Sequence, residues 1–423
     1  MKAYTNVNLV TCDSEFHVYR EGLLVVEGDR IAYCGPHDQA WLAKCSETVD
    51  YEGAWIMPGL VNCHTHSAMT LLRGIRDDSN LHEWLEDYIW PAESQFTAEV
   101  TTKAVQFALA EMLLSGTTTF NDMYNPHGVD IKQVYQAVRH SGMRCYFSPT
   151  LFTSPAETGE ETLTRTRAII EEILSYDDKD FQVMVAPHSP YACDEDLLKG
   201  SLELAHELDL KLHIHVAETP NENKIILERY GKRPLAFLKD LGYLEQPAIF
   251  AHGVELNPSE IADLANSPVS IAHNPISNLK LASGVAPVTN LLAAGVTVGL
   301  ATDSVASNNN LDMFEEGRTA ALLQKMRVGD ASQFTIDQAL KALTIEGAKA
   351  LGLEDKIGSL EVGKQADFIA IQPKGRIHLY PLENMLSHLV YAVKGSDVQD
   401  VYIAGKQVVR DGQVLTVNVN IKD

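Results

Sequence analysis

Two pairs of histidines, each pair separated by one residue, are the first feature of this sequence that could hold a metal ion. His64 and His66 follow an apolar run in the stretch PGLVNCHTHSAM, and His213 and His215 repeat the spacing. Side chains two residues apart on a strand point to the same face, so each pair could reach one ion. The spacing itself is weak, because chance alone supplies roughly 0.5 such triplets in a chain with this histidine content. Whether either pair binds a metal ion therefore depends on where the pairs lie in the fold.

Other chemically capable side chains also stand at the ends of apolar runs. Amphipathic segments separate these runs, which cover 60–66, 117–124, 144–151, 181–189, 211–218, 248–256, 269–275 and 297–304. Strands that alternate with helices predict an α/β protein with a parallel sheet, and eight such units predict a (β/α)8 TIM-type barrel. Catalytic groups of that fold gather at the C-terminal ends of the strands. We expect His188, His252 and Asp303 there with the histidine pairs, and Glu218 just beyond.

Three histidines and one aspartate make a ligand set for one divalent metal ion. His64, His66, His215 and Asp303 would supply three imidazole nitrogens and one carboxylate oxygen. This set favours Zn²⁺, although Fe²⁺ or Mn²⁺ would tolerate it. A catalytic zinc site lowers the pKa of a bound water to about 7, which makes hydrolysis at neutral pH accessible.

The second histidine pair is expected to divide its roles. His215 lies nearer the strand end, three residues before Glu218, so it is favoured as the ligand, while His213 is expected in the core one layer deeper. His273, which lies in another run, is interpreted as structural. One ion is favoured over two, because 181–189 contains no lysine that could bridge a metal pair.

The cysteines and tryptophans near these motifs are interpreted as packing residues. The six cysteines show no CxxC motif or regular spacing, which argues against disulfides and a structural zinc site. Cys63 and Cys193 border the expected site but have no adjacent base, so a cysteine nucleophile is disfavoured. Trp84 and Trp90 are expected to pack a loop, with substrate stacking as the alternative.

The two ends of the chain differ from the middle. Residues 1–56 and 357–423 contain short alternating strands separated by turn residues, and each end alone has too few strands to bury a face well. We therefore expect one small β-sandwich-like domain built from both chain ends. The metal-dependent hydrolase barrel would then span 57–356.

The charge and hydropathy of the chain favour a small-molecule substrate over nucleic acid or a membrane as the binding partner. Lysine and arginine total 34 against 57 acidic residues, for a net charge of -23. Nucleic acid and anionic membranes are disfavoured as partners, because phosphate binding needs basic side chains. The sequence has no signal-like segment and no apolar run of about 18 residues, so we expect a cytoplasmic protein. The oligomeric state stays open, and a homo-oligomer is compatible with the sequence.

Several separated motifs, in order along the chain, resemble the amidohydrolase superfamily. Within it they are most similar to the branch of 5'-methylthioadenosine/S-adenosylhomocysteine deaminases, with triazine hydrolases as near relatives. The resemblance covers nearly the whole chain and rests on PGLVNCHTHSAMTLLRGIRDD, LHEWLEDYIWPAE, APHSPYAC, HIHVAET, FAHGVEL, HNPISNLKLASGVAPV and LATDSVASNNNLDMFEE.

The resemblance implies a role for each candidate residue. It matches His64, His66, His215 and Asp303 to the metal ligands of the family. Glu218 matches the residue that carries a proton to the substrate ring, and Asp303 would accept the proton lost by the attacking water. His252 would orient that water and His188 would contact the substrate. Glu93, in WPAE, matches the carboxylate that holds the ribose hydroxyls, and only the resemblance indicates it.

The implied reaction is hydrolytic deamination of an adenine nucleoside, which gives an inosine-type product and ammonia. An aminohydrolase or chlorohydrolase acting on a triazine or another heterocycle would use the same ligands. A non-catalytic scaffold is disfavoured, because such proteins lose ligands that are all present here.

One departure from the family concerns the far end of the substrate. An arginine after the third strand commonly meets the carboxylate of S-adenosylhomocysteine, but this chain has Ser, Pro and Thr at 148–150. Arg144 precedes the core of that strand, and Arg165 or Arg167 could substitute from the following helix. The sequence therefore leaves the recognition of a carboxylate-bearing substrate open.

Overall fold

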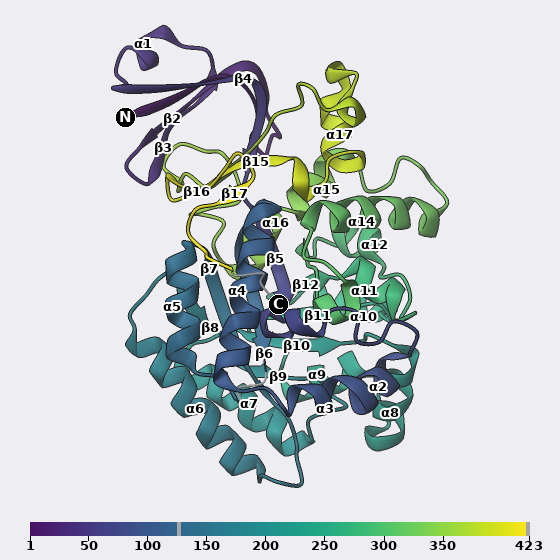
Figure 1. Ribbon diagram of the computed structural model, residues 1–423. Helices are drawn as coiled ribbons and strands as arrows, with labels where there is room; N and C mark the ends of the chain where they lie inside the picture. The colour runs from purple at the N-terminus through teal and green to yellow at the C-terminus, as the bar shows by residue number, and fades with distance from the viewer. Residues whose placement is uncertain (125–127, 420–423) are drawn as a thin grey trace.

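The computed structural model describes residues 1–124 and 128–419. Helices surround a curled set of parallel strands in the lower part of Figure 1, and a separate eight-stranded sheet lies above them. No helix in the described part of the chain is both long and apolar enough to cross a membrane.

The parallel strands form two sheets that two bridges connect. One sheet contains β5 (Leu60–Thr65), β6 (Thr117–Tyr124), β7 (Arg144–Leu151) and β8 (Phe181–Val183), and the short β9 (Ala186–Pro187) also pairs with β7. The other contains β10 (Leu212–Val216), β11 (Ala248–His252), β12 (Val269–His273) and β13 (Val298–Leu300). Parallel bridges join Val185 to Leu212 and Thr65 to Asp303, so the two sheets meet along both edges.

The run predicted as one strand over 181–189 is divided into β8 and β9. Between them Val185 changes partner: its N–H donates to the carbonyl of Lys211, and its carbonyl accepts from the N–H of His213. This change of partner joins the two sheets. The sequence shows only a continuous apolar run there, because both pairings bury the same side chains.

The helices between the strands begin and end at residues with clear local causes. Thr158 and Glu161 form a capping box at the start of α6 (Gly159–Ser175), and Gly142, with φ of 82°, ends α5 (Ile131–Ser141). The larger helices are α4 (Ala98–Leu114), α5 (Ile131–Ser141), α6 (Gly159–Ser175), α7 (Glu195–Leu208), α8 (Pro220–Tyr230), α9 (Pro234–Leu241) and α14 (Met313–Val328). Shorter helices are α10 (Pro258–Leu264), α11 (Pro275–Lys280), α12 (Val288–Ala293), α13 (Val305–Asn308), α15 (Ile336–Ala342), α16 (Ile345–Leu351) and α17 (Met385–Tyr391).

Strands from both ends of the chain share one eight-stranded sheet. Its order is β17-β16-β15-β14-β4-β1-β2-β3, and the pairing of β4 with β14 joins the N-terminal strands to the C-terminal strands. A buried ion pair between Arg144 of β7 and Asp367 ties this sheet to the parallel strands. The sheet contains β1 (Lys2–Val10), β2 (Val18–Glu27), β3 (Arg30–Pro36), β4 (Glu47–Pro58), β14 (Phe368–Ile371), β15 (Val398–Ile403), β16 (Lys406–Arg410) and β17 (Gln413–Val414).

One end of the parallel strands is filled by α16. Ile345 and Ala348 of this helix pack with Val61, Cys63 and other small or branched side chains of the strands. Gly299 permits the close approach, since a Cβ there would lie 2.3 Å from the sulfur of Cys63. The opposite end of the strands stays available for polar side chains.

Candidate active site

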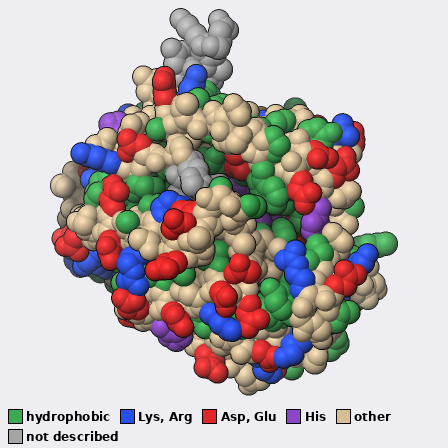
Figure 2. All heavy atoms as spheres, turned by 90° about the horizontal axis from the view of Figure 1, so that it is seen from below, with side chains coloured by type: hydrophobic (Ala, Val, Ile, Leu, Met, Phe, Trp, Pro, Cys, Tyr) green, Lys and Arg blue, Asp and Glu red, His purple; other side chains and the backbone are tan. Residues whose placement is uncertain are grey.

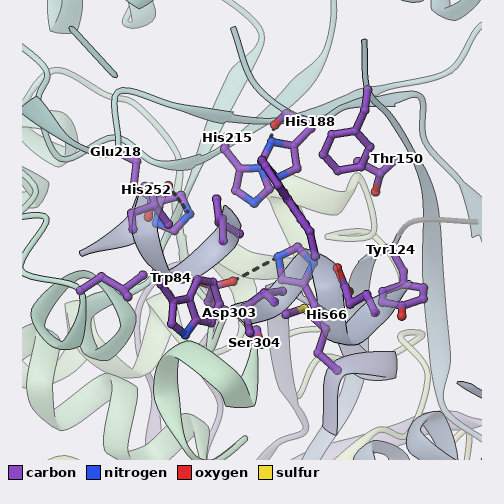
Figure 3. Close-up of a pocket in the computed structure, with 18 of the residues that line it drawn as sticks. His66, Trp84, Tyr124, Thr150, His188, His215, Glu218, His252, Asp303 and Ser304 are labelled. Atoms are coloured by element: carbon purple, nitrogen blue, oxygen red, sulfur yellow. Dashed lines mark hydrogen bonds and ion pairs between the residues drawn. The ribbon is translucent and has the colours of Figure 1, made fainter. Parts of the chain in front are cut away.

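The side chains predicted to be metal ligands lie together at the ends of β5, β10 and β13. Nitrogen atoms of His64, His66 and His215 lie within 4.8 Å of one another. The Oδ1 atom of Asp303 lies 3.3 Å from Nε2 of His64 and 3.2 Å from Nε2 of His66. Figure 3 shows His66, His215 and Asp303 pointing toward one another, with a dashed line between Asp303 and His66.

Backbone irregularities at the strand ends direct these side chains. The pairing of β5 with β6 shifts register between Asn62 and Thr65, where the first histidine pair begins. Such irregularities re-aim side chains near active sites. Two further site residues have left-handed backbone conformations, with φ of 59° at Asp303 and 78° at His252. Both are non-glycine residues, so the surrounding structure has to hold them there.

The ring nitrogens that face away from the site fix two of the imidazole tautomers. Nδ1 of His66 donates to the carbonyl of Met123 at 2.5 Å, and Nδ1 of His215 donates to the carbonyl of His188 at 2.7 Å. A carbonyl can only accept a hydrogen bond, so both neutral rings carry their lone pair on Nε2. Metal-binding histidines are commonly held in this way.

Asp303 is held from the side opposite the histidines. Its Oδ2 accepts hydrogen bonds from the hydroxyls of Ser277 at 2.6 Å and Ser307 at 3.0 Å. This leaves Oδ1 directed at His64 and His66. The carboxylate is thus oriented before any ligand binds.

These residues fit one divalent metal ion. Nε2 of His64 is buried and has no hydrogen-bond partner within the described residues. Leaving a buried polar atom unpaired is costly, and an ion would satisfy it. Burial lowers the pKa of His64 to about 4 and that of His215 well below its ordinary value, so both rings are neutral, the form that binds metal.

Glu218 and His252 lie beside this group. The Oε2 atom of Glu218 lies 3.7 Å from Nε2 of His252, and both side chains are buried. Glu222 holds the backbone turn that follows β10, because its carboxylate accepts hydrogen bonds from the N–H groups of Ala217 and Glu218 at 3.0 and 2.7 Å. His252 in turn contacts Oδ1 of Asn278 through Nδ1 at 2.8 Å.

His188 and Glu93 face the same pocket from different elements. The ring of His188 lies 4.5 Å from that of His215, measured between centroids, and its Nδ1 contacts the hydroxyl of Ser189 at 3.0 Å. Glu93 lies in α3 (Trp90–Glu93), hydrogen-bonds to Tyr124 and lines the pocket. Burial raises the pKa of the Glu93 carboxyl to about 7.

The rest of the pocket is mostly apolar. Trp84 and Trp90, expected to pack a loop, both line it, and Trp84 is also buried against the hydrophobic core. Further apolar lining comes from Met69, Leu81, Leu85, Ile89, Phe152 and Leu281. Figure 2 shows a hollow near the middle of this face, with hydrophobic side chains beside it and a histidine visible inside.

A larger outer pocket continues from the first one and shares Trp90, Glu93, Tyr124, Phe152 and Tyr191 with it. The wall of this outer pocket includes Arg165, whose guanidinium pairs with the carboxylate of Glu157 at 3.0 and 2.9 Å. Arg167 does not line the pocket, because it pairs with the exposed Glu207. Arg144 is committed to Asp367 at the other end of β7. Of the three arginines considered from the sequence, only Arg165 reaches the pocket.

The cysteines beside the site are not activated. Burial raises the pKa of Cys63 and of Cys193 to about 12, so both are thiols at neutral pH. This agrees with the expectation that neither is a nucleophile.

Several residues that orient the site had no recognisable signal in the sequence. Ser277, Ser307 and Asn278 lie in or beside short helices after the strands, where serine and asparagine are common for many reasons. Tyr124 ends β6 and hydrogen-bonds to Glu93. His213, expected in the core, is buried and contacts His64.

Comparison with known proteins gives full-length matches. The amidohydrolase family matches residues 55–408. A Bacillus cereus protein named 5-methylthioadenosine/S-adenosylhomocysteine deaminase is 46% identical over 421 residues, which cover 98% of this chain and 95% of that protein. A relative of the same name from Bacillus anthracis is also 46% identical over the same coverage.

Solved structures also match this chain along nearly its whole length. The crystal structure of an adenosine deaminase from Xanthomonas campestris with bound zinc superposes with a TM-score of 0.92 at 35% identity, covering 99% of this chain and 94% of that chain. Atrazine chlorohydrolase from Arthrobacter aurescens, complexed with zinc, shares the fold with a TM-score of 0.88 at 23% identity, covering 99% and 97%. The family match and the relatives that align along nearly the whole chain show that this protein belongs to the amidohydrolase family.

Proposed function

We propose that this protein is a metal-dependent aminohydrolase that deaminates adenine nucleosides of the methylthioadenosine and S-adenosylhomocysteine type, and releases ammonia. The observation that carries the proposal is 46% identity, along 98% of the chain, to proteins named for this activity. The grouping of His64, His66, His215 and Asp303 beside an apolar pocket supports it.

His64, His66, His215 and Asp303 would hold one divalent ion, with Zn²⁺ favoured by the nitrogen-rich set and by the zinc present in two related structures. Such an ion supplies Lewis acidity and lowers the pKa of a water to about 7. The protein orients the donor atoms, because His66 and His215 are fixed by carbonyls and Asp303 by two serine hydroxyls.

Glu218 and Asp303 have environments that suit opposite proton transfers. Burial, with a smaller effect from the charge of Asp303, raises the pKa of Glu218 well above its ordinary value, so this carboxyl can donate a proton to ring nitrogen N1. Asp303 would bind the ion as a carboxylate, with Oδ2 held by the hydroxyls of Ser277 and Ser307, so its Oδ1 can accept the proton of the water that attacks C6.

The pocket walls provide places for the rest of a nucleoside. Trp84, Leu85 and Leu281 would pack against the flat purine, and His188 would contact the ring. Glu93 would accept hydrogen bonds from the ribose hydroxyls, with Tyr124 fixing its carboxyl. The 5'-substituent would then enter the outer pocket.

Arg165 is the residue we propose for a carboxylate on that substituent. Its Nε and Nη2 atoms are held by the carboxylate of Glu157 at 3.0 and 2.9 Å, which fixes the plane of the guanidinium group. The side chain of Arg165 also lines the outer pocket, which places its positive charge at the wall of that pocket. Arg165 would therefore replace the arginine that is missing at 148–150.

The strand pairings of the structure also support a division of the chain into a barrel and a second domain. We infer that the parallel strands, joined at Val185–Leu212 and Thr65–Asp303, are a closed eight-stranded barrel over 57–356. The strands of 1–56 and 357–423 would form the second domain. A small-molecule partner follows from the proposed activity, and the pocket is the place for it.

A substrate panel tests the proposal against the alternative of triazine or other heterocycle hydrolysis. Adenosine, methylthioadenosine, S-adenosylhomocysteine and an amino- or chlorotriazine would be incubated with protein of known zinc content. Ammonia and chloride release would be measured for each. We expect ammonia from the nucleosides and neither product from the triazines. Turnover of a triazine without turnover of any nucleoside would support the alternative.

A further inference from the structure

His213 contacts His64 at the ring nitrogen that faces away from the metal position. Nε2 of His213 lies 2.9 Å from Nδ1 of His64, and both side chains are fully buried. At this distance one ring donates a proton and the other accepts it. The direction of this hydrogen bond decides which nitrogen of His64 keeps a lone pair.

The neighbours of His213 support one direction. Asn121 has a fixed orientation, because its Nδ2 donates to the carbonyl of Cys63 at 3.0 Å. Its Oδ1 therefore accepts from the hydroxyl of Ser148 at 3.2 Å. With that proton committed, the oxygen of Ser148 can accept from Nδ1 of His213, 3.3 Å away. His213 then has an unprotonated Nε2, which can accept the Nδ1 proton of His64.

The opposite direction would disable the site. Nδ2 of Asn121 also lies 3.2 Å from Nδ1 of His213. If it donated to that nitrogen, neutral His213 would carry its proton on Nε2 and donate to His64. His64 would then be protonated on its own Nε2, the atom that lies 3.3 Å from Asp303, and could not bind an ion.

We propose that His213 is a positioning residue that accepts the Nδ1 proton of His64 and so holds the Nε2 lone pair of His64 toward the metal position. The inference rests on the proposed metal site and extends it to the first histidine of the second HxH pair. His66 and His215 donate to backbone carbonyls, which no substitution removes. His64 relies on a side chain instead, so its orientation depends on a single replaceable residue.

Zinc affinity of the full-length protein tests this directly. Each variant would be stripped of metal and titrated with Zn²⁺ in competition with a chromophoric chelator. His213→Leu removes the acceptor, and we expect zinc affinity about 10- to 100-fold weaker, as for other residues that orient metal ligands. His213→Gln offers a carbonyl oxygen to His64 and should stay within a few-fold of the wild type. The matched control is His273→Leu, which removes another buried histidine whose ring nitrogens have no hydrogen-bond partner among the described residues.

Two outcomes would overturn the inference: wild-type zinc affinity in His213→Leu, or equal loss in His213→Gln and His213→Leu. If His213→Leu fails to fold, Ser148→Ala carries the test. That variant removes the acceptor of the His213 Nδ1 proton and should weaken zinc binding several-fold, and unchanged binding would contradict the proposal. Because affinity is read without substrate, a failure here is separate from a failure of the deaminase proposal, which would appear as absent ammonia release from a normally zinc-loaded wild type.

Discussion

Glu218→Gln removes the proton-donating ability of the side chain at position 218 while nearly conserving its volume. The carboxyl lies 3.7 Å from His252 and is buried, and its turn is held through the backbone by Glu222. The replacement therefore removes the proposed proton transfer and leaves the four proposed metal ligands in place. A positioned acid or base contributes about 10²- to 10⁴-fold to rate. At about 1.36 kcal/mol per tenfold change, the activation barrier should rise by about 2.7 to 5.4 kcal/mol.

The measurement is kcat for ammonia release from methylthioadenosine, together with zinc content by elemental analysis. We expect kcat to fall by at least 100-fold, about the lower end of that range, with stoichiometric zinc retained. Glu228→Gln is the matched control, because it makes the same change at an exposed position of α8, the helix that follows Glu218. Near-normal kcat in Glu218→Gln would refute the assignment of Glu218. Loss of zinc together with activity would show that Glu218 acts through the metal site.

Three further predictions address the substrate and the fold. Because burial raises the pKa of Glu93 to about 7, its ionised form, which accepts ribose hydroxyls best, is lost as pH falls through that value. KM for nucleosides should therefore rise below pH about 7, and a pH profile unchanged in Glu93→Gln would contradict this. Arg165→Gln should raise KM for S-adenosylhomocysteine and leave KM for methylthioadenosine unchanged, while Arg167→Gln, in a surface pair, should alter neither. Gly299→Ala would place a Cβ 2.3 Å from a buried cysteine sulfur and should lower the free energy of unfolding by about 1 to 3 kcal/mol, whereas Gly159→Ala, where a Cβ meets open space, should have little effect in the same denaturant titration.

The sequence predicts those parts of the fold that depend on periodic patterns. The apolar runs that contain the parallel strands were identified, because alternation of strand and helix leaves a regular signal. The division of 181–189 into β8 and β9 was missed, since a change of pairing partner at Val185 alters hydrogen bonds and not side-chain burial. The eight-stranded sheet joins β4 to β14, two strands whose pairing is set by tertiary packing that local sequence cannot report.

In the candidate site, too, some residues could be predicted from the sequence and others could not. His64, His66, His215 and Asp303 could be predicted to converge, because parallel strands bring their C-terminal ends to one edge. Glu93 lies on a short helix far from any predicted strand end, so only the family resemblance indicated it.

The residues that hold the predicted ligands were beyond sequence reasoning. Ser277 and Ser307 support Asp303 through contacts that exist only in the folded chain. The position of His213 in the core was expected, but its hydrogen bond to His64 depends on ring orientation, which no spacing rule gives.

A metal ion held by His64, His66, His215 and Asp303 is proposed to be essential for deamination of an adenine nucleoside. The most direct measurement is ammonia released from methylthioadenosine by the full-length protein before chelation, after chelation and after zinc is restored. We expect one ammonia per inosine-type product, loss of the activity when the metal is removed, and recovery at one zinc per chain. Ammonia release that persists in metal-free protein, or none from zinc-loaded protein, would contradict it.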